Sequence, residues 1–361
     1  MRKIASIVFF SLMLAAQAGI AEEKGDGGFN DVIILESTPV KNQGGTGTCW
    51  SFATTSFLES ELLRTGKGEF DLSEMFFVNY AYKNKAKKYY LYHGMHVFDK
   101  GGQAHDVIDV VREYGIVPDE IVPGEKTEGR FQDRDLIKEL SRVVEKENKW
   151  KRNFDASETK KLDPVLKKYL GNIPGKFEFN GKEFTPGSFR DYLGLNPDDY
   201  IELTSYSHHP FYEPFDLELP DNWSHSLYYN VPVDALVEVM VNSLAKGYTF
   251  CWDGDTSERT FRHKKGKADL PEKEIGKVTQ GQRQETFFSR KTTDDHLMHI
   301  VGMAKDEDGR VFFKTKNSWG PESNDNGGFL YMSEDYVRLK TIAIMVHRDA
   351  IPQKIAKKLN P

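Results

Sequence analysis

Residues 43–53 read QGGTGTCWSFA, and this stretch decides how the rest of the chain is interpreted. An amide side chain, Gln43, is followed by a glycine-rich loop and then by Cys49, which opens an apolar stretch with helical spacing. A cysteine in the first turn of a helix lies beside unsatisfied backbone N–H groups, which favour the negatively charged thiolate. The stretch therefore predicts a reactive cysteine rather than a structural one.

A β-hairpin is predicted near the end of the chain. Residues 296–304 form a nearly continuous apolar run, residues 305–309 a polar turn and residues 311–315 a second strand. In an antiparallel pair, facing residues are equally distant from the centre of the turn. The midpoint between His296 and Asn317 falls inside the predicted turn. The two side chains are therefore expected close together at the open end of the hairpin.

Together, the side chains of these two regions would supply the groups that catalysis by a thiol nucleophile needs. Cys49 would attack a carbonyl as the thiolate, and His296 would be the base that takes its proton. Asn317 would orient the imidazole, while Gln43 and the backbone N–H of Cys49 would bind the oxyanion. Trp319 would either shield the hydrogen bond between His296 and Asn317 from water or serve as an ordinary core residue.

Two histidines compete for the role of the base. His296 and His299 are three residues apart on one strand, so their side chains point to opposite faces and only one can face Cys49. His296 is preferred, because it precedes the strand and gives the better hairpin register. The diverging imidazoles also argue against a metal site. The pair His208-His209 predicts a loop with solvated or packed imidazoles, and nothing in the sequence implies a metal or an organic cofactor.

The composition narrows the classes of function. The chain has 361 residues, 39% of them hydrophobic and 12% aromatic, with a formal net charge of -6. This content is sufficient for a substantial core. A nucleic-acid-binding protein would need a concentrated basic surface, and the basic runs at residues 83–88 and 262–267 are short or interrupted. They are expected to be solvated faces, and no nucleic-acid partner is predicted.

The N-terminus has the layout of a signal peptide, predicted to comprise residues 1–21. Arg2 and Lys3 precede an apolar stretch, residues 4–16, that is too short for a comfortable membrane span. Small residues at positions 16–21 suit a signal peptidase. No later segment of the sequence is apolar enough to span a membrane. The sequence therefore predicts an exported protein, periplasmic or secreted, without stable membrane insertion.

Export makes the two cysteines informative. A disulfide between Cys49 and Cys251 would abolish the nucleophilicity of Cys49, although an oxidising compartment favours disulfides. A chain of 41.3 kDa builds a sufficient core without such a bond. Cys251 lies in an aromatic-rich, strand-like run, residues 248–252. We therefore predict that Cys49 is free and functional and that Cys251 is buried and structural.

The remaining pattern is helical in the first third, mixed in the middle and rich in strands in the last third. Helices are expected at residues 49–64, after Ser73 as the N-cap, and at residues 104–114, 134–152, about 158–170 and 233–246. Residues 177–184 alternate around Asn180-Gly181, which predicts a hairpin with a two-residue turn.

These motifs resemble the papain-like cysteine peptidase superfamily. The resemblance is specific at residues 43–53 and 316–320, and residues 71–74 and Gly101-Gly102 follow in the expected order between them. In papain-like enzymes the histidine and the asparagine lie roughly 130–150 residues after the cysteine. Here about a hundred further residues intervene, as expected for an insertion into the papain pattern.

The insertion, together with Thr48 before the cysteine, resembles the bleomycin hydrolase and bacterial aminopeptidase C branch. Further similar stretches are residues 38–43, 228–232 and 296–298. The resemblance implies an α+β, papain-like fold with an active-site cleft between two domains. Within the mature chain, residues 22–361, its parts are a helical left domain at about 40–120, a mixed α/β insertion at about 120–230, a β-barrel-like right domain at about 231–350 and a C-terminal tail at 351–361.

The resemblance also implies an activity and partners. An exported aminopeptidase that releases N-terminal residues from peptide substrates is expected, with a hexamer as the homo-oligomer known in the branch. In that branch the C-terminal tail enters the cleft and restricts cleavage to the N-terminus of the substrate. Because the tail of this chain is short, an endopeptidase with an open cleft is an alternative. An inactive peptide-binding protein on the same fold is a second alternative.

Overall fold

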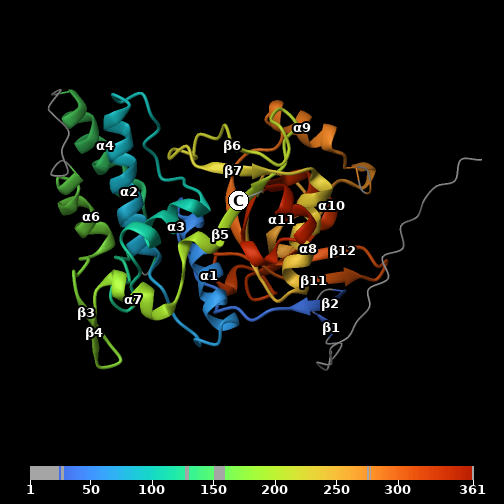
Figure 1. The fold of residues 1–361 in the computed structure, drawn as a ribbon, viewed down its shortest axis with the longest axis horizontal. Coiled ribbons are helices and arrows are strands. Elements are labelled where there is room, and N and C mark those ends of the chain that lie inside the picture. Colours follow the sequence, from blue (N-terminus) through green and yellow to red (C-terminus); the bar gives the residue numbers. More distant parts are fainter. Residues whose placement is uncertain are drawn as a thin grey trace, which may run out of the picture.

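In this computed structural model a helical half and a β-rich half lie side by side (Figure 1). The structure describes residues 24–25, 28–126, 130–149, 159–274, 276 and 278–359, so the predicted signal peptide lies outside the described residues. The helices of the first half are α1 (Cys49–Arg64), α2 (Glu74–Leu91), α3 (Ala104–Glu113), α4 (Arg134–Lys149), α6 (Asp163–Leu170) and α7 (Pro186–Leu193). Those of the second half are α8 (Val233–Ala245), α9 (Gln280–Phe288), α10 (Glu334–Lys340) and α11 (Gln353–Leu359).

The predicted helices are confirmed where the structure describes them. Ser73 caps α2, because its hydroxyl accepts the N–H of Phe76 at 3.0 Å. The predicted extension of α4 beyond residue 149 lies outside the described residues. Helix α6 begins at Asp163, later than expected, and Pro164 occupies its first turn, where the missing N–H costs no hydrogen bond.

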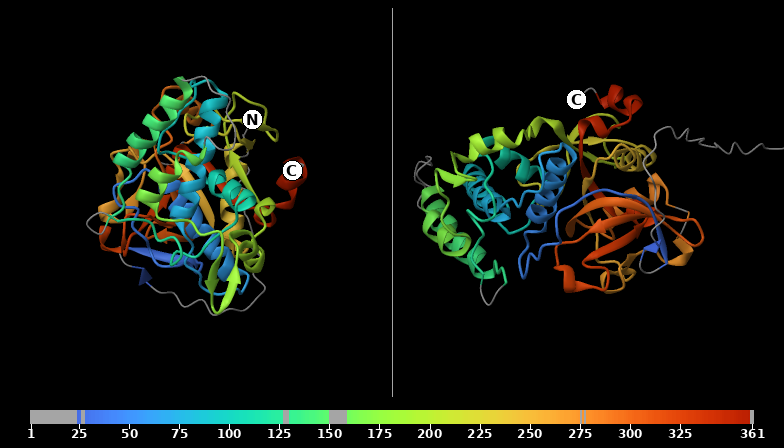
Figure 2. Two further views of the ribbon diagram at one scale, coloured as in Figure 1. Left: turned by 90° about the vertical axis from the view of Figure 1, so that its left-hand side faces the viewer. Right: turned by 90° about the horizontal axis from the view of Figure 1, so that it is seen from below.

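The β-rich half is built on one mixed, strongly curved sheet (Figure 2). Its strands are β1 (Lys24–Gly25), β2 (Phe29–Ile34), β5 (Tyr200–Thr204), β6 (Pro214–Asp216), β7 (Leu227–Asn230), β8 (Phe250–Gly254), β9 (Phe261–Arg262), β10 (Lys267–Ala268), β11 (His296–Asp306), β12 (Val311–Lys316), β13 (Phe329–Ser333) and β14 (Thr341–His347). The order across the sheet is β6-β7-β5-β14-β8-β11-β12-β13-β10-β9, with β1 on β2 and β2 on β11. Three strands of the predicted insertion, β5, β6 and β7, thus belong to this sheet.

A separate hairpin, β3 (Phe177–Phe179) and β4 (Lys182–Phe184), confirms the predicted two-residue turn. Its central residues, Asn180 and Gly181, have φ angles of 49° and 71°, as this tight turn requires. Short 3-10 helices complete the described chain: η1 (Pro197–Asp199), η2 (His263–Lys265), η3 (Glu272–Glu274), η4 (Pro321–Ser323) and η5 (Arg348–Ala350). In the described residues, no helix is both long and apolar enough to cross a membrane.

The hairpin of β11 and β12 is confirmed, but its predicted register is wrong. Pairing of His296 with Asn317 would have set His299 opposite Lys314, whereas His299 faces Lys316. The ladder also shifts at a bulge between Ile300 and Gly302. Consequently Asn317 lies just beyond the end of β12 and meets His296 through its side chain, not as a cross-strand neighbour.

Helix α1 joins the two halves, and every residue from 50 to 62 is buried. One side packs into the helical core, where Phe57, Leu58 and Leu62 are 0% exposed. The other side lies on the sheet, where Ser56 Oγ is 2.9 Å from His299 Nδ1. The predicted structural cysteine, Cys251, is buried on β8 and not disulfide-bonded. A helix buried all round has no solvent-facing stripe, and the polar side chains of α1, such as Ser56 and Glu59, form hydrogen bonds inside the molecule.

The C-terminal helix α11 packs on the β-rich half. Ile355 and Leu359 are buried in the core of that half, and Lys354 forms an ion pair with Glu238 of α8 at 2.8 Å. Just before α11, Asn242 of α8 donates to the carbonyl of residue 350 at 2.5 Å. The described part of the tail is therefore held by α8.

A partly buried lysine holds the segment before the glycine loop against two helices. Lys41 Nζ lies 3.3 Å from Glu59 of α1 and 2.7 Å from Glu74 of α2. Both carboxylates are almost fully buried, at 1% and 3% exposure of the side chain. Burial alone would lower the pKa of Lys41, but these carboxylates raise it, so the lysine is charged.

Removing this cation tests how strongly the segment depends on it. The substitution Lys41→Ala leaves two buried carboxylates without their partner, which costs about 3 kcal/mol of unfolding free energy. Lys87→Ala, at an exposed lysine of α2, is the control and is expected to change it by less than about 0.5 kcal/mol. Urea denaturation followed by circular dichroism measures both. Equal losses in the two variants would contradict the assigned role of Lys41.

Candidate active site

Cys49 lies in the first turn of α1, with two backbone N–H groups directed at its sulfur. Burial raises the pKa of the thiol to about 12, and the carboxylates of Asp294 and Asp253 act in the same direction. Backbone hydrogen bonds from Leu297 of β11 and from Trp50 oppose this effect and lower the pKa. The thiol therefore stays protonated until a base removes its proton.

His296 stands next to this thiol and is 5% exposed. The following residue, Leu297, directs its N–H at the sulfur of Cys49, which brings the start of β11, and with it His296, close to this thiol. His296 Nε2 lies 2.8 Å from Asn317 Oδ1. The ring of Trp319 stacks on the imidazole, with centroids 4.9 Å apart and an interplanar angle of 30°. Trp319 thus shields the bond between His296 and Asn317, as one of the two sequence interpretations expected.

A chain of hydrogen bonds fixes which nitrogen of His296 carries its proton. Ser323 Oγ donates to Gly320 O at 2.6 Å, so it accepts the Nε2–H of His263 at 2.8 Å. His263 Nδ1 is then an acceptor, and the Nδ2–H of Asn317 reaches it at 3.2 Å. Asn317 Oδ1 consequently faces His296 Nε2, which must carry the hydrogen. The lone pair of His296 Nδ1 is left for the thiol.

His263 is a part of this site that the sequence analysis missed. It lies in the basic run at residues 262–267, which was expected to be a solvated face, yet it is 8% exposed. Its ring packs edge-on against Trp319, with centroids 4.7 Å apart. Burial and then Lys264 lower its pKa to about 4, which keeps it neutral. No sequence pattern marks it, because its partner Asn317 is distant in the chain.

Gln43 is fixed beside the nucleophile at both ends of its amide. Its Nε2 donates to Thr46 O at 2.8 Å, and its Oε1 accepts from Ser318 Oγ at 2.6 Å. Its backbone N–H also donates to Ser318 O at 2.8 Å. The second hydrogen of the amide is not used by these bonds. The structure therefore joins Gln43 to Ser318, the residue that follows Asn317, and the oxyanion role of Gln43 stays a prediction.

The competing histidine, His299, faces a different environment. Its Nδ1 lies 2.9 Å from Ser56 Oγ, which also accepts from Lys316 Nζ at 2.7 Å. His299 is fully buried, and burial and then Lys316 lower its pKa well below the ordinary value. A neutral, fully enclosed imidazole holds α1 on the sheet, and His296 is the histidine beside Cys49.

The glycine loop makes backbone contacts that no larger residue would permit. Gly44 has a φ angle of 66°, and a Cβ there would come within 2.6 Å of Phe131 O. On the opposite side of the nucleophile, a Cβ on Gly102 would meet the ring of Trp50 at 2.9 Å. Both glycines are required by close backbone approach to their neighbours.

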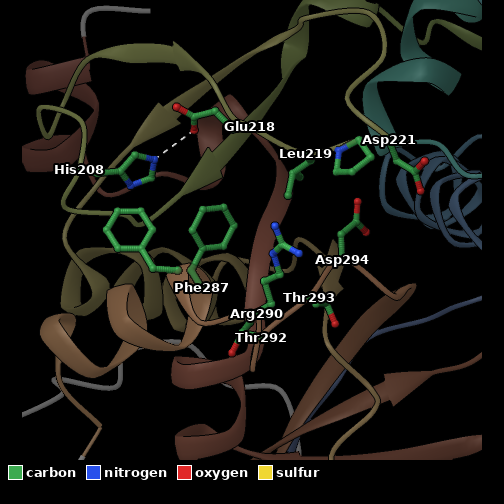
Figure 3. Close-up of a pocket in the computed structure, with 11 residues that line it drawn as sticks. His208, Glu218, Leu219, Asp221, Phe287, Arg290, Thr292, Thr293 and Asp294 are labelled. Carbon is green, nitrogen blue, oxygen red and sulfur yellow. Dashed lines mark hydrogen bonds and ion pairs between the residues drawn. The ribbon is translucent and has the colours of Figure 1, made fainter. Parts of the chain in front are cut away.

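A group of carboxylates borders the site, and the sequence analysis did not single it out. Asp221 and Asp294 line a cavity of about 760 Å³ together with Thr292, Thr293 and Arg290 (Figure 3). Acidic residues from separate segments carry no common pattern in the sequence, so only the folded chain reveals them.

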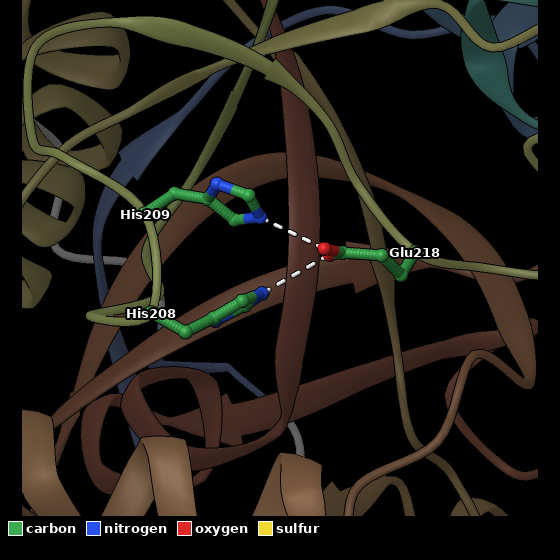
Figure 4. Close-up of side chains that lie close together, drawn as sticks. All are labelled: His208, His209 and Glu218. Carbon is green, nitrogen blue, oxygen red and sulfur yellow. Dashed lines mark hydrogen bonds and ion pairs between the residues drawn. The ribbon is translucent and has the colours of Figure 1, made fainter.

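One cluster in the described residues could ligate a metal ion. His208, His209 and Glu218 place one ligand atom each within 4.8 Å of one another (Figure 4). Glu218 accepts from the Nε2 of His208 at 3.0 Å and from the Nε2 of His209 at 2.8 Å, and Gln284 Nε2 lies 3.0 Å from His208 Nδ1. Neutral imidazoles satisfy all of these bonds, so the donor set does not call for a metal.

Comparison with known proteins agrees with this geometry. A family model described as Peptidase C1-like family matches residues 14–361. Aminopeptidase W and aminopeptidase G of Lactobacillus delbrueckii subsp. lactis are 24% and 25% identical to the chain; the alignments cover 90% and 92% of it, and 84% and 88% of the relatives. The mitochondrial cysteine proteinase 1 of Saccharomyces cerevisiae is 23% identical, over 91% of the chain and 79% of the relative.

A solved structure supports the fold. The crystal structure of pepw from Lactobacillus rhamnosis hn001 superposes with a TM-score of 0.75 at 20% identity, covering 91% of this chain and 84% of that one. The α+β, papain-like fold is thereby confirmed.

The hydrogen-bond chain through His263 predicts a measurable effect on the thiol. In His263→Phe the Asn317 amide loses its acceptor and can rotate, so the proton of His296 is no longer held on Nε2. We expect alkylation of Cys49 by iodoacetamide at pH 7 to slow by about tenfold, the equivalent of one pKa unit. His93→Phe, at an exposed histidine, is the control. An unchanged rate in a folded His263→Phe variant would contradict the positioning role.

Proposed function

The chain belongs to the Peptidase C1-like family, in the bleomycin hydrolase and aminopeptidase C branch, and is a cysteine-type peptidase; from this premise we propose that it removes residues from the N-terminus of peptides. The observation that carries the proposal is the juxtaposition of Cys49, at the start of a buried helix, with a histidine that an asparagine holds at 2.8 Å. This arrangement supplies a nucleophile, a base and an orienting amide.

In the proposed mechanism the proton of the thiol moves to His296 Nδ1, and the Cys49 sulfur attacks the carbonyl carbon of the first peptide bond. The imidazolium that forms is held by Asn317 Oδ1 through Nε2–H. As the C–N bond breaks, the imidazolium returns its proton to the leaving amine. A water molecule, deprotonated by His296, then cleaves the thioester and restores the thiol.

The negative charge that develops on the carbonyl oxygen needs donors. We assign this role to the free amide hydrogen of Gln43 and to the backbone N–H of Cys49. The bond from Ser318 to the Gln43 oxygen keeps the nitrogen side of this amide directed away from Ser318. A fixed donor needs no reorganisation during the reaction, which is the source of its catalytic effect.

The restriction to the N-terminus rests on two observations. The similar proteins from Lactobacillus delbrueckii are named aminopeptidases. The carboxylates beside the site, Asp221, Asp253 and Asp294, favour a positively charged group at the end of the substrate.

An endopeptidase with an open cleft is the second candidate. Its support is the course of the C-terminal segment, since α11 packs on α8 through Ile355 and pairs Lys354 with Glu238. The described part of the tail, which ends at residue 359, is held on the β-rich half by these contacts, so we look for another feature that would exclude longer substrates from an aminopeptidase. The inactive binding protein is not retained, because competent residue types occupy all four site positions.

Two substrates and two variants test the proposal. A peptide with a free α-amino group should be cleaved by the purified protein under reductant, and its N-acetylated form at least tenfold more slowly. Cys49→Ala should abolish cleavage, because no other group supplies the thiolate. Cys251→Ala, which removes the buried structural thiol, should retain it. Equal cleavage of both peptides would replace the aminopeptidase with the endopeptidase, and activity in Cys49→Ala would contradict both.

We also propose that the protein is exported, on the strength of the N-terminal sequence alone. Arg2 and Lys3, the apolar stretch at residues 4–16 and the small residues that follow predict cleavage after residue 18 or 21. N-terminal sequencing of protein from fractionated cells that express the full chain is the measurement. An intact N-terminus in the cytoplasmic fraction would contradict export. The hexamer implied by the resemblance stays a prediction.

A further inference from the structure

Carboxyl groups from distant parts of the chain meet near the thiol of Cys49, and two of them line the cavity of about 760 Å³. Asp294 lies just before β11, Asp253 belongs to β8, and Asp221 lies in the loop between β6 and β7. In Figure 3 Asp221 and Asp294 stand at the same end of the cavity. The carboxyl groups of Asp253 and Asp294 are within hydrogen-bonding reach of each other.

The buried polar atoms in this group lack partners. Asp253 is 3% exposed, and apart from the carboxyl group of Asp294 neither of its carboxylate oxygens has a hydrogen-bond donor. Asp294 accepts from Gln103 Nε2 at 2.5 Å. Gln103 Oε1 and the hydroxyl of Tyr228, both on residues that are 0% exposed, have no partner either. Unpartnered buried polar atoms are costly, and they indicate a ligand that satisfies them.

Strand pairing places Asp253 beside the nucleophile. In the ladder between β8 and β11, Asp253 faces Leu297, and facing residues of an antiparallel pair point to the same side of the sheet. Leu297 packs into the core around α1 and directs its N–H at the sulfur of Cys49. The Asp253 carboxyl group therefore points towards the start of α1, and Asp294 is two residues before His296.

The opposite wall is formed by the segment that follows α2. Gln103 reaches across to Asp294, and Gly102 lies against the ring of Trp50, which is next to the nucleophile. Asp221 lies directly over Gly101. Asp294 and Asp221 thus lie against this segment, which faces the β-rich half.

We propose that Asp253 and Asp294, with Asp221 beside them, bind the α-ammonium group of the peptide substrate. The proposal rests on the aminopeptidase function proposed above and names the residues that select the free N-terminus. In this proposal the N-terminus of the substrate is bound by side chains of the β-rich half. The described part of the C-terminal segment is held by α8 instead.

The geometry of a peptide fits this position. In the first residue of a substrate, the nitrogen lies about 2.5 Å from the carbonyl carbon, as the bond lengths N–Cα and Cα–C require. A group that binds this nitrogen must therefore lie near the attacking sulfur, and Asp253 is the cross-strand partner of Leu297, whose N–H is directed at that sulfur. An N-acetylated peptide brings an amide there, which cannot neutralise a carboxylate.

An ammonium group suits these carboxylates better than a metal ion. In the described residues, the cluster of His208, His209 and Glu218 is the group whose ligand atoms gather closely enough for one ion, and the three aspartates are not among them. An ammonium group has three N–H donors that point in different directions, so it can satisfy separated acceptors. Each bond would join two charged groups, which makes it strong.

The protonation of the carboxyl groups supports the same conclusion. Burial and then the charge of Asp221 raise the pKa of Asp294 to about 7, and burial and Asp294 raise the pKa of Asp253 well above its usual range. Without a cation the pair therefore holds a proton near neutral pH. A bound ammonium group replaces that proton and lowers both pKa values.

Three forms of one decapeptide test the proposal, with products identified by mass spectrometry. One form has a free N-terminus, the second is N-acetylated, and the third is N-acetylated with arginine as its second residue. The wild type should prefer the free form. In Asp294→Asn and Asp253→Asn we expect kcat/KM for the free form to fall by about 10- to 100-fold, the range for a charge-assisted bond, and the acetylated form to be unaffected or faster.

The matched control is Asp295→Asn, which removes the same charge one position away. Asp295 is exposed, and its carboxylate oxygens accept from Thr293 Oγ1 at 2.8 Å and from the N–H of Thr256 at 3.2 Å. This variant should keep the preference for the free N-terminus. If this variant also lost the preference, the loss of any nearby negative charge would explain the result. The assignment of Asp253 and Asp294 would then be overturned.

A second readout separates loss of the anchor from collapse of the site. The carboxylate of Asp294 raises the pKa of the Cys49 thiol, so its removal should increase the thiolate fraction. At pH 8, iodoacetamide should therefore alkylate Cys49 in Asp294→Asn two- to tenfold faster than in the wild type. Slower alkylation of Cys49 in Asp294→Asn would mean that the substitution damages the site. The fall in kcat/KM would then have another cause, and the proposal would be overturned.

The outcomes distinguish this proposal from the proposed function. If the wild type cleaves the acetylated decapeptide as fast as the free one, the proposed aminopeptidase function is contradicted, and the proposed binding of the α-ammonium group is contradicted with it. If the wild type prefers the free form and the variants keep this preference, only the proposed binding of the α-ammonium group by these aspartates is contradicted. If the variants lose cleavage only of the acetylated arginine peptide, the carboxylates bind a basic side chain and not the α-ammonium group.

Discussion

The packing of α1 against the sheet is the constraint on which the rest of this structure depends. The helix is buried from residue 50 to 62, and its contacts with Cys251 and His299 fix its height and rotation over β8 and β11. These contacts set its first residue, Cys49, beside the backbone of Leu297. Nucleophile and base thus come from different halves of the molecule, and one helix–sheet interface determines their distance.

Proton positions at the site follow from hydrogen bonds outside it. The carbonyl of Gly320 orients the Ser323 hydroxyl, which fixes the tautomer of His263 and, through Asn317, that of His296. Each bond of the chain then has one possible donor and one possible acceptor, so the orientation of the chain is unambiguous. The imidazole of His296 needs no acidic partner to present its lone pair, and Trp319 shields its bond to Asn317 from water.

Charge at the site reflects two opposing requirements. A carboxylate near the thiol disfavours the thiolate, so the proximity of Asp253 and Asp294 has a cost for the nucleophile. The same carboxylates attract a cation to the point where the N-terminus of a substrate would lie. A bound cation cancels the unfavourable field at the sulfur. Substrate binding and activation of the nucleophile are then coupled through electrostatics.

The sequence by itself determined the helices, the hairpin after His296 and the position of Cys49 at the start of a helix, because local spacing and the glycine loop encode them. It also indicated the encounter of His296 with Asn317, which are joined by a short hairpin, although the turn is centred further along the chain than expected, so that Lys305 pairs with Val311 and the predicted register is wrong. Only the tertiary structure decided the role of His263 and the grouping of Asp221, Asp253 and Asp294. These residues lie on separate segments, and contacts between distant segments are created by packing and leave no periodic signal in the chain.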